Sequence, residues 1–287
     1  MIYNDKNIGQ ALRERILVLD GAMGTLIQTK GLTESDFATG PFASWSVPLK
    51  GDNDVLNLTR PDVIEEIHRS YVEAGSDIIT TNTFNCTRIS QSEYGCGDYV
   101  SPMAEAGARI ARRVADGAGR PVWVAGSLGP TSKSLSLASD MNVPESRSAS
   151  FDEMAACYRE LVLALRRGGV DLLLLETCYD ALNAKAALCA ISKVDGELGS
   201  RIPVMVSATV NDRSGRTLTG QTLEAFYNSI SHYPVLSFGL NCSFGVTELR
   251  PMIERLAATV PAYISLYPNA GLPNELGEYE ETPCYTE

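Results

Sequence analysis

The chain has 287 residues, of which 44% are hydrophobic and 21% charged, and its formal net charge is −11. This composition is typical of a globular protein with an ample core, and the acidic balance argues against nucleic acid as a partner. Seven cysteines without framework spacing indicate a reducing compartment. There is no signal-peptide core and no apolar run of membrane-spanning length, so we expect a cytoplasmic protein that does not bind membranes.

Seven short apolar runs recur along the chain, and each is followed directly by polar residues. Because the runs are continuous rather than alternating, each predicts a strand that is buried on both faces. The predicted strands are residues 16–19, 77–81, 122–125, 171–175, 204–206, 235–238 and 263–267.

Amphipathic segments lie between these strands and are long enough to form helices. The predicted helices are residues 61–74, 102–115, 151–167, 181–194, 223–231 and 246–258. Strands that alternate with helices in this way indicate an α/β fold with a parallel sheet.

A barrel fits the pattern better than an open sheet. Residues 20–25 follow the first strand but lack the GxGxxG spacing of a dinucleotide-binding turn, and no GxxxxGK[ST] motif occurs. Seven units with polar strand ends favour a (β/α)₈ TIM barrel. No apolar run follows Asn269, so the eighth strand is missing and the first and seventh strands would have open edges. We predict one domain, residues 1–287, that is a TIM barrel truncated after about the seventh strand.

The residues that follow the strands are candidates for a binding site, because the carboxyl ends of parallel strands meet at one face. Asp20 follows the first predicted strand, Glu176 the fourth, and Cys242 lies just beyond the sixth. By position alone, a buried structural cysteine is the default for Cys242. A turn cap for Asp20 and an ion pair for Glu176 are the corresponding structural alternatives.

Several motifs, taken in order, resemble the homocysteine S-methyltransferase family. They are DGAMGT at 20–25, NDVLNLTRP at 53–61, YVEAGSDIITTNTF at 71–84, SLGP at 127–130, ET at 176–177, GLNC at 239–242 and PNAGLP at 268–273. Each motif is weak alone, but their order across nearly the whole chain is specific. The similarity is closest to the N-terminal homocysteine-binding module of cobalamin-dependent methionine synthase, and the family fold is a TIM barrel.

The resemblance implies a set of substrate-binding residues. Asp20 and Glu176 would hold the ammonium group of homocysteine, and the backbone N–H groups of Gly21 and Ala22 would face its carboxylate. The substrate-binding residues predicted in this way are Asp20, Gly21, Ala22, Ser127, Glu176 and Thr177.

The resemblance also implies a zinc site that this chain does not complete. Family members bind zinc through three cysteines, and Cys242 matches the one in the Gly-x-Asn-Cys motif. The other two form a Gly-Gly-Cys-Cys motif that is absent here, and Cys284 has neither a glycine pair nor a second cysteine beside it. Asn269 is a possible additional metal-site residue. Because zinc sites need three or four ligands, we expect this chain alone to bind zinc weakly and to be inactive.

In the family, zinc makes the homocysteine thiol an anionic nucleophile that accepts a methyl group and becomes methionine. Similarity to the cobalamin-dependent module implies methylcobalamin as the donor, with downstream folate- and cobalamin-binding modules as partners. Two alternatives stay open. One is a stand-alone homocysteine methyltransferase that uses betaine or S-methylmethionine. The other is a non-catalytic fragment that needs a partner to complete its barrel.

Overall fold

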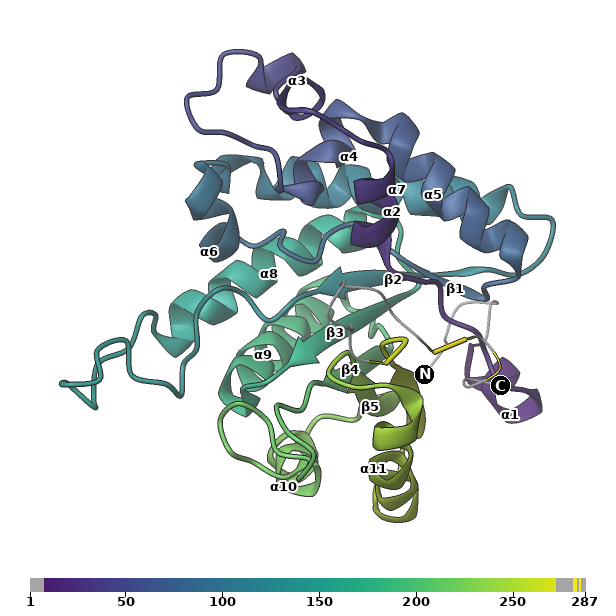
Figure 1. The fold of residues 1–287 in the computed structure, drawn as a ribbon, viewed down its shortest axis with the longest axis vertical. Coiled ribbons are helices and arrows are strands. Elements are labelled where there is room, and N and C mark those ends of the chain that lie inside the picture. The colour runs from purple at the N-terminus through teal and green to yellow at the C-terminus, as the bar shows by residue number, and fades with distance from the viewer. Residues whose placement is uncertain (1–7, 272–280, 283, 285–287) are drawn as a thin grey trace.

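The computed structural model describes residues 8–271, 281, 282 and 284. Within them, one curled sheet contains six parallel strands whose spatial order follows the chain order (Figure 1). The strands are β1 Ile78–Thr80, β2 Trp123–Leu128, β3 Leu172–Cys178, β4 Val204–Ala208, β5 Ser237–Asn241 and β6 Tyr263–Tyr267. A parallel sheet that advances by one strand at each crossover is the arrangement of a TIM barrel. The predicted fold class, a truncated barrel, is confirmed.

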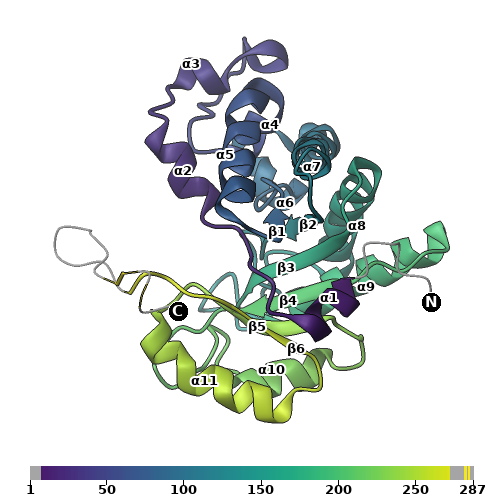
Figure 2. The ribbon, with the colours of Figure 1, turned by 90° about the vertical axis from the view of Figure 1, so that its right-hand side faces the viewer.

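The six predicted helices all exist, with ends that differ by a few residues at most. They are α5 Pro61–Ala74, α7 Val100–Asp116, α8 Phe151–Gly168, α9 Ala181–Leu198, α10 Leu223–Ile230 and α11 Val246–Thr259. They lie along the outer side of the curled sheet (Figure 2). Shorter helices were not predicted: α1 Ile8–Glu14, α2 Met23–Thr29, α3 Glu34–Phe37, α4 Leu56–Thr59 and α6 Arg88–Gln91, with 3₁₀ turns at Gly40–Phe42, Asn53–Val55, Ser92–Tyr94 and Gly97–Tyr99. None of the described helices is both long and apolar enough to cross a membrane.

Local signals set the ends of the long helices. Ser150 and Glu153 form a capping box at the start of α8, and Gly169, at φ 89°, ends it. Asp180 begins α9 by accepting a hydrogen bond from the N–H of Leu182. These caps fix where α8 and α9 begin and where α8 ends, just before β3.

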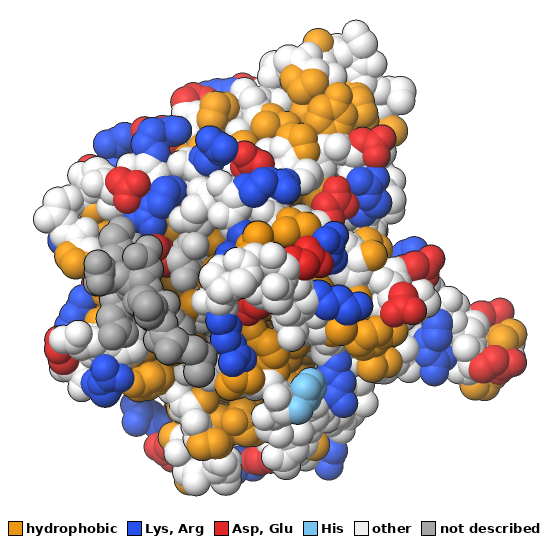
Figure 3. Space-filling model, turned by 180° about the vertical axis from the view of Figure 1, so that it is seen from behind, with side chains coloured by type: hydrophobic (Ala, Val, Ile, Leu, Met, Phe, Trp, Pro, Cys, Tyr) orange, Lys and Arg blue, Asp and Glu red, His pale blue; other side chains and the backbone are white. Residues whose placement is uncertain are grey.

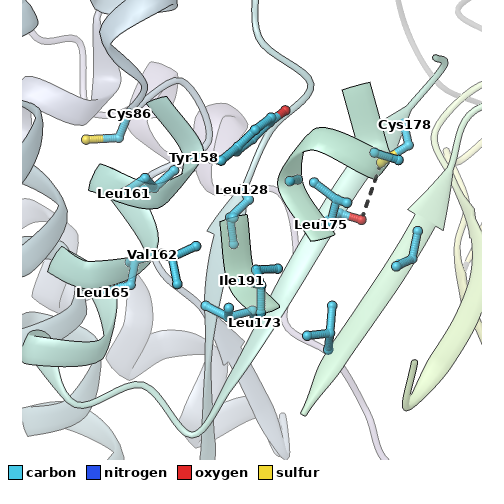
Figure 4. Close-up of a cluster of buried hydrophobic side chains, with 14 of the residues drawn as sticks. Cys86, Leu128, Tyr158, Leu161, Val162, Leu165, Leu173, Leu175, Cys178 and Ile191 are labelled. Atoms are coloured by element: carbon cyan, nitrogen blue, oxygen red, sulfur yellow. Dashed lines mark hydrogen bonds between the residues drawn. The ribbon is translucent and has the colours of Figure 1, made fainter. Parts of the chain in front are cut away.

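The core has two layers. The outer layer lies between the sheet and the helices, where Leu173 and Leu175 of β3 meet Leu161 and Leu165 of α8 (Figure 4). The hydroxyl of Tyr158 enters this layer and donates to the carbonyl oxygen of Gly129 at 2.8 Å. The inner layer fills the curl with apolar side chains, which include Ile8, Ile78, Trp123, Leu172 and Met205.

The first predicted strand differs from expectation. Residues 16–19 form a single parallel bridge, between Leu19 and Ile78, instead of a full strand. Ile16 is 88% exposed and Val18 55% exposed, so the prediction that this run is buried on both faces was wrong. The physical reason is that residues 16–19 pair with β1 on one side, while no described strand pairs with them on the other. In the part of the chain that the structure describes, the sheet therefore has six strands and one bridged segment, not seven strands.

We call the space between residues 16–22 and β6 the seam. It is a cavity of about 990 Å³ whose lining includes Leu17, Leu19, Ile264 and Leu266. On the face opposite to that of Figure 1, hydrophobic side chains gather in a hollow beside a histidine, among scattered charged groups (Figure 3). The seam marks the position in the barrel that the described residues leave unfilled.

Candidate functional site

A second cavity, of about 350 Å³, lies at the carboxyl ends of the strands. The predicted substrate and metal residues Asp20, Gly21, Ala22, Ser127, Glu176, Thr177 and Cys242 all line it. Asn269 does not: it lines the adjoining seam. The topology thus brings together residues that are up to 222 positions apart in the sequence, from Asp20 to Cys242. Their individual roles remain predictions.

Asp20 is held against the end of β1. The backbone N–H of Thr80 donates to Oδ2 of Asp20 at 2.6 Å, and the Thr80 hydroxyl donates to Oδ1 at 2.8 Å. Burial raises the pKa of Asp20 to about 7 against these two hydrogen bonds, and the charge of Glu176 raises it further. The carboxyl group is therefore poised to ionise near neutral pH when a cation arrives.

Glu176 reaches the same cavity from the end of β3. The hydroxyl of Ser127 donates to its Oε1 at 2.5 Å. Burial raises the pKa of Glu176, and the hydrogen bond from Ser127 opposes this rise. Among the described residues, no lysine or arginine lines this cavity. The alternative that Glu176 belongs to a structural ion pair therefore has no support. Two carboxyl groups, the buried Asp20 and the partly buried Glu176, share a cavity whose described lining has no cation.

Gly21 and Ala22 follow Asp20 and form the side of the cavity beside Tyr71. A Cβ atom on Gly21 would lie 2.6 Å from the Tyr71 ring, so glycine is what lets the ring pack there. Burial raises the pKa of Tyr71, and the charge of Asp20 adds to this effect. Tyr71 thus stays a neutral hydroxyl next to the carboxyl pair.

Cys242 lies just past the end of β5, and its thiol is half-buried. The side-chain amide of Asn241 donates to its Sγ at 3.1 Å. Burial raises the pKa of the Cys242 thiol, the Asn241 hydrogen bond lowers it, and the charge of Glu176 raises it. The thiol is therefore oriented by its neighbour but is not activated by a nearby cation.

Zinc does not fit the donors that the structure describes. No group of three or more histidine, cysteine or carboxylate side chains within residues 8–271, 281, 282 and 284 could hold a metal ion. Cys284 is exposed, and among the cysteines that the structure describes Cys242 alone lines the 350 Å³ cavity. One thiolate does not make a zinc site, so no chemical step through zinc can be built from the described residues.

Sequence reasoning missed several residues of this cavity. Tyr267, at the end of β6, and Asn241, at the end of β5, both line it. The rule that strand ends face the site would have found both. Met205 was not detectable in this way, because it lies within β4 and reaches the cavity from inside the barrel.

Comparison with known proteins decides the family. The model of the homocysteine S-methyltransferase family matches residues 17–287. This chain belongs to the homocysteine S-methyltransferase family. The resemblance found in its motifs is thereby confirmed, and methyltransferase activity is the activity of its class.

Solved structures show that this family member shares a known fold. The homocysteine methyltransferase MmuM from Escherichia coli, in its metallated form, is 22% identical and superposes with a TM-score of 0.72 over 91% of this chain and 86% of that chain. The apo form of MmuM is 21% identical, with a TM-score of 0.66 over 90% of this chain and 84% of that chain. At this identity the likeness establishes the fold alone.

Proposed function

We propose that this chain is the homocysteine-binding part of a methyltransferase that transfers a methyl group to homocysteine and so yields methionine. The observation that carries this proposal is the pair of carboxyl groups in one cavity of about 350 Å³, the buried Asp20 and the partly buried Glu176. A primary ammonium group is the complement that two such carboxyls lack. The cavity has the size of a small-molecule site.

Binding would change the ionisation of the pair. An ammonium group between Asp20 and Glu176 favours their carboxylate forms and lowers both pKa values. The hydrogen bonds from Thr80 and Ser127 keep the two carboxyls in place before the ligand arrives. The amino-acid end of homocysteine is then fixed on the Asp20 side, and its thiol extends toward Cys242.

We propose zinc as the metal of the complete site, with Cys242 as one ligand and Asn269 as a further candidate. Only a few per cent of a simple thiol is ionised at neutral pH, and a bound metal supplies the missing acidity. Two more thiolates are required, and the described residues do not contain them near Cys242. The order of motifs supports methylcobalamin as the donor, carried by a separate module together with a folate-binding one.

The seam favours a second candidate function, a chain that needs a partner before it is catalytic. The unpaired side of β6 and that of residues 17–19 line the same cavity. A polypeptide that filled this cavity would also touch the site, because Asp20, Ser265 and Tyr267 line both cavities. Betaine or S-methylmethionine as donor is the remaining alternative within the family.

The proposal is tested by calorimetric titration with homocysteine. Glu176→Gln keeps the shape of the side chain but removes its charge, so the loss of a charge-assisted hydrogen bond should raise Kd roughly ten- to a hundredfold. Glu254→Gln, at an exposed position of α11, is the matched control and should bind as the wild type does. Unchanged affinity in a folded Glu176→Gln protein, or no binding by the wild type, would refute homocysteine binding at this site.

A separate measurement tests the metal assignment. Metal analysis of the dialysed chain should find far less than one zinc per molecule, because a single thiolate lines the cavity. One zinc per chain would show that the ligands are wrongly assigned.

A further inference from the structure

Two residues of the site have a backbone conformation that is unusual for their type. Thr177 has φ 57° and Cys242 has φ 58°, both in the left-handed region. Non-glycine residues rarely adopt such angles, and for a β-branched threonine the conformation persists only where its surroundings enforce it. Something must therefore hold the ends of β3 and β5 in place.

The pairing of β3 with β4 is interrupted at the same point. Its register shifts between Leu175 and Cys178, which leaves Glu176 and Thr177 in an irregularity of the ladder. The N–H of Thr177 finds its acceptor in a side chain instead: it donates to Oδ1 of Asn241 at 3.0 Å. The irregularity is what turns Glu176 and Thr177 toward the cavity, and Asn241 satisfies the backbone group that it frees.

Asn241 uses its whole hydrogen-bonding capacity in this position. Its Oδ1 also accepts from the hydroxyl of Ser207 at 2.6 Å, and its Nδ2 donates to Oγ1 of Thr177 at 2.8 Å and to Sγ of Cys242 at 3.1 Å. A backbone N–H can only donate, so the contact with Thr177 fixes which end of the amide is oxygen. The side chain is 5% exposed and joins the ends of β3, β4 and β5.

We propose that Asn241 is a positioning residue, whose amide holds Thr177 in its left-handed conformation and holds the sulfur of Cys242, and so directs both side chains toward the cavity. It acts through these two neighbours, not by contact with the reacting atoms. The effect of Asn241 on homocysteine binding rests on the proposed function, whereas its effect on the backbone of Thr177 does not.

The first test is a set of double-mutant cycles read by denaturant unfolding. Asn241→Ala is made in the wild type, in Thr177→Gly and in Thr177→Ala. Both substitutions at 177 remove the hydroxyl, but only glycine accepts a left-handed φ at no steric cost. We expect Asn241→Ala to lower the unfolding midpoint strongly beside threonine or alanine, and by about half as much beside glycine. Equal losses beside glycine and alanine would overturn the proposal.

The second test reads the thiol directly, by iodoacetamide labelling at one pH with mass spectrometry of the Cys242 peptide. In Asn241→Ala the labelling of Cys242 should slow severalfold, because the sulfur is no longer held toward the cavity. The labelling of Cys189, far along the chain on α9, should not change and serves as the internal control. Unchanged labelling of Cys242 would refute the part of the proposal that concerns the thiol.

Asn241→Asp covers the case in which the alanine variant does not fold. Aspartate keeps the two acceptor contacts, with the Thr177 N–H and the Ser207 hydroxyl, but cannot donate to Sγ. Because the substitution also adds a buried carboxyl group near Glu176, we expect a stability between those of the wild type and Asn241→Ala, with slowed labelling of Cys242, and wild-type labelling would again refute the role.

Homocysteine titration separates this proposal from the proposed function. Asn241→Ala should raise the Kd for homocysteine about tenfold, as expected for the loss of a few weak contacts. If the wild-type chain does not bind homocysteine, the proposed function is refuted. The role of Asn241 is then decided by the unfolding cycles alone. Wild-type binding that is lost in Glu176→Gln but unaffected in Asn241→Ala keeps the function and removes Asn241 from the site.

Discussion

The middle of the sheet and the seam are built from the same kind of sequence but end in different states. In β3 the apolar run is paired on both edges and covered by α8 and α9, and Leu173 is fully buried. In β6 an equally apolar run is paired, among the described strands, with β5 alone, and every residue of β6 is only partly buried. A continuous apolar run therefore indicates that a strand is suited to burial between paired strands and covering helices. It does not show that these neighbours are present.

Hydrogen exchange within β6 gives the largest contrast. The carbonyl oxygen of Ser265 faces β5, since a Cβ on Gly239 would lie 1.7 Å from it, so the N–H of Ser265 points the same way. In a parallel strand the alternate residues Ile264 and Leu266 direct their N–H groups toward the seam. We expect the Ser265 amide to be protected on the order of a thousandfold more than these two, measured by NMR. Equal protection would show that the edge is covered in solution.

A pair of leucine truncations compares the two regions by stability. Leu173→Ala opens a cavity in a closed core and should lower the free energy of unfolding by about 2–5 kcal/mol. Leu266→Ala removes the same atoms beside the seam, where the residue is already partly exposed, and should cost about 1 kcal/mol. Chemical unfolding measures both. Equal costs would mean that the seam is as closed as the core.

Asp77 holds the bridged segment, residues 16–19, against the sheet, so substitution of Asp77 should destabilise one side of the seam. Its carboxylate accepts from Arg15 at 2.6 and 2.7 Å and from the N–H of Val18 at 3.0 Å. Because Arg15 is half-exposed, Asp77→Asn should cost only about 1–2 kcal/mol in denaturant unfolding. Asp98→Asn, in an exposed pair with Arg88, is the control and should cost less than about 0.5 kcal/mol.

The cost of Asp77→Asn should depend on pH with a definite sign. The hydrogen bond from Arg15 holds the pKa of Asp77 below its ordinary value of 3.8. A lowered folded-state pKa stabilises the fold fully above 3.8, and this contribution is lost as the pH falls through the lowered value. The gap between the wild type and Asp77→Asn should therefore close in acid. A gap that persists there would assign the effect to packing.

The carboxyl pair provides a predicted effect on ligand affinity. Methionine has the ammonium group but no ionisable thiol, so it isolates the carboxyls. With the pKa of Asp20 near 7, methionine affinity should rise about tenfold between pH 6 and pH 8, because the carboxylate form binds the cation. Asp20→Asn should bind weakly with a flat profile in calorimetric titration. A rise that persists in the variant would assign the titration to another group.

The candidate site was predictable where position along a strand decides it. Asp20, Glu176 and Cys242 follow apolar runs, and parallel topology brings such ends together. Asn269 also follows a strand, but it lines the seam together with Pro268 and Ala270, and not the cavity that the other strand ends share. The proposed positioning role of Asn241 was not predictable, since its partner Thr177 is 64 positions away and no sequence signal predicts the irregularity in β3.

The sequence by itself determined the α/β class, the order of the parallel strands and the bounds of the long helices. These features depend on hydrophobic period and on caps, which act over a few residues. Only the tertiary structure decided that Ile16 and Val18 face outward, that two carboxyls share one cavity without a cation, and that Asn241 holds the ends of β3 and β5. Exposure, ionisation and side-chain contacts depend on which distant segments come to lie beside a residue, and that is fixed only when the whole chain has packed.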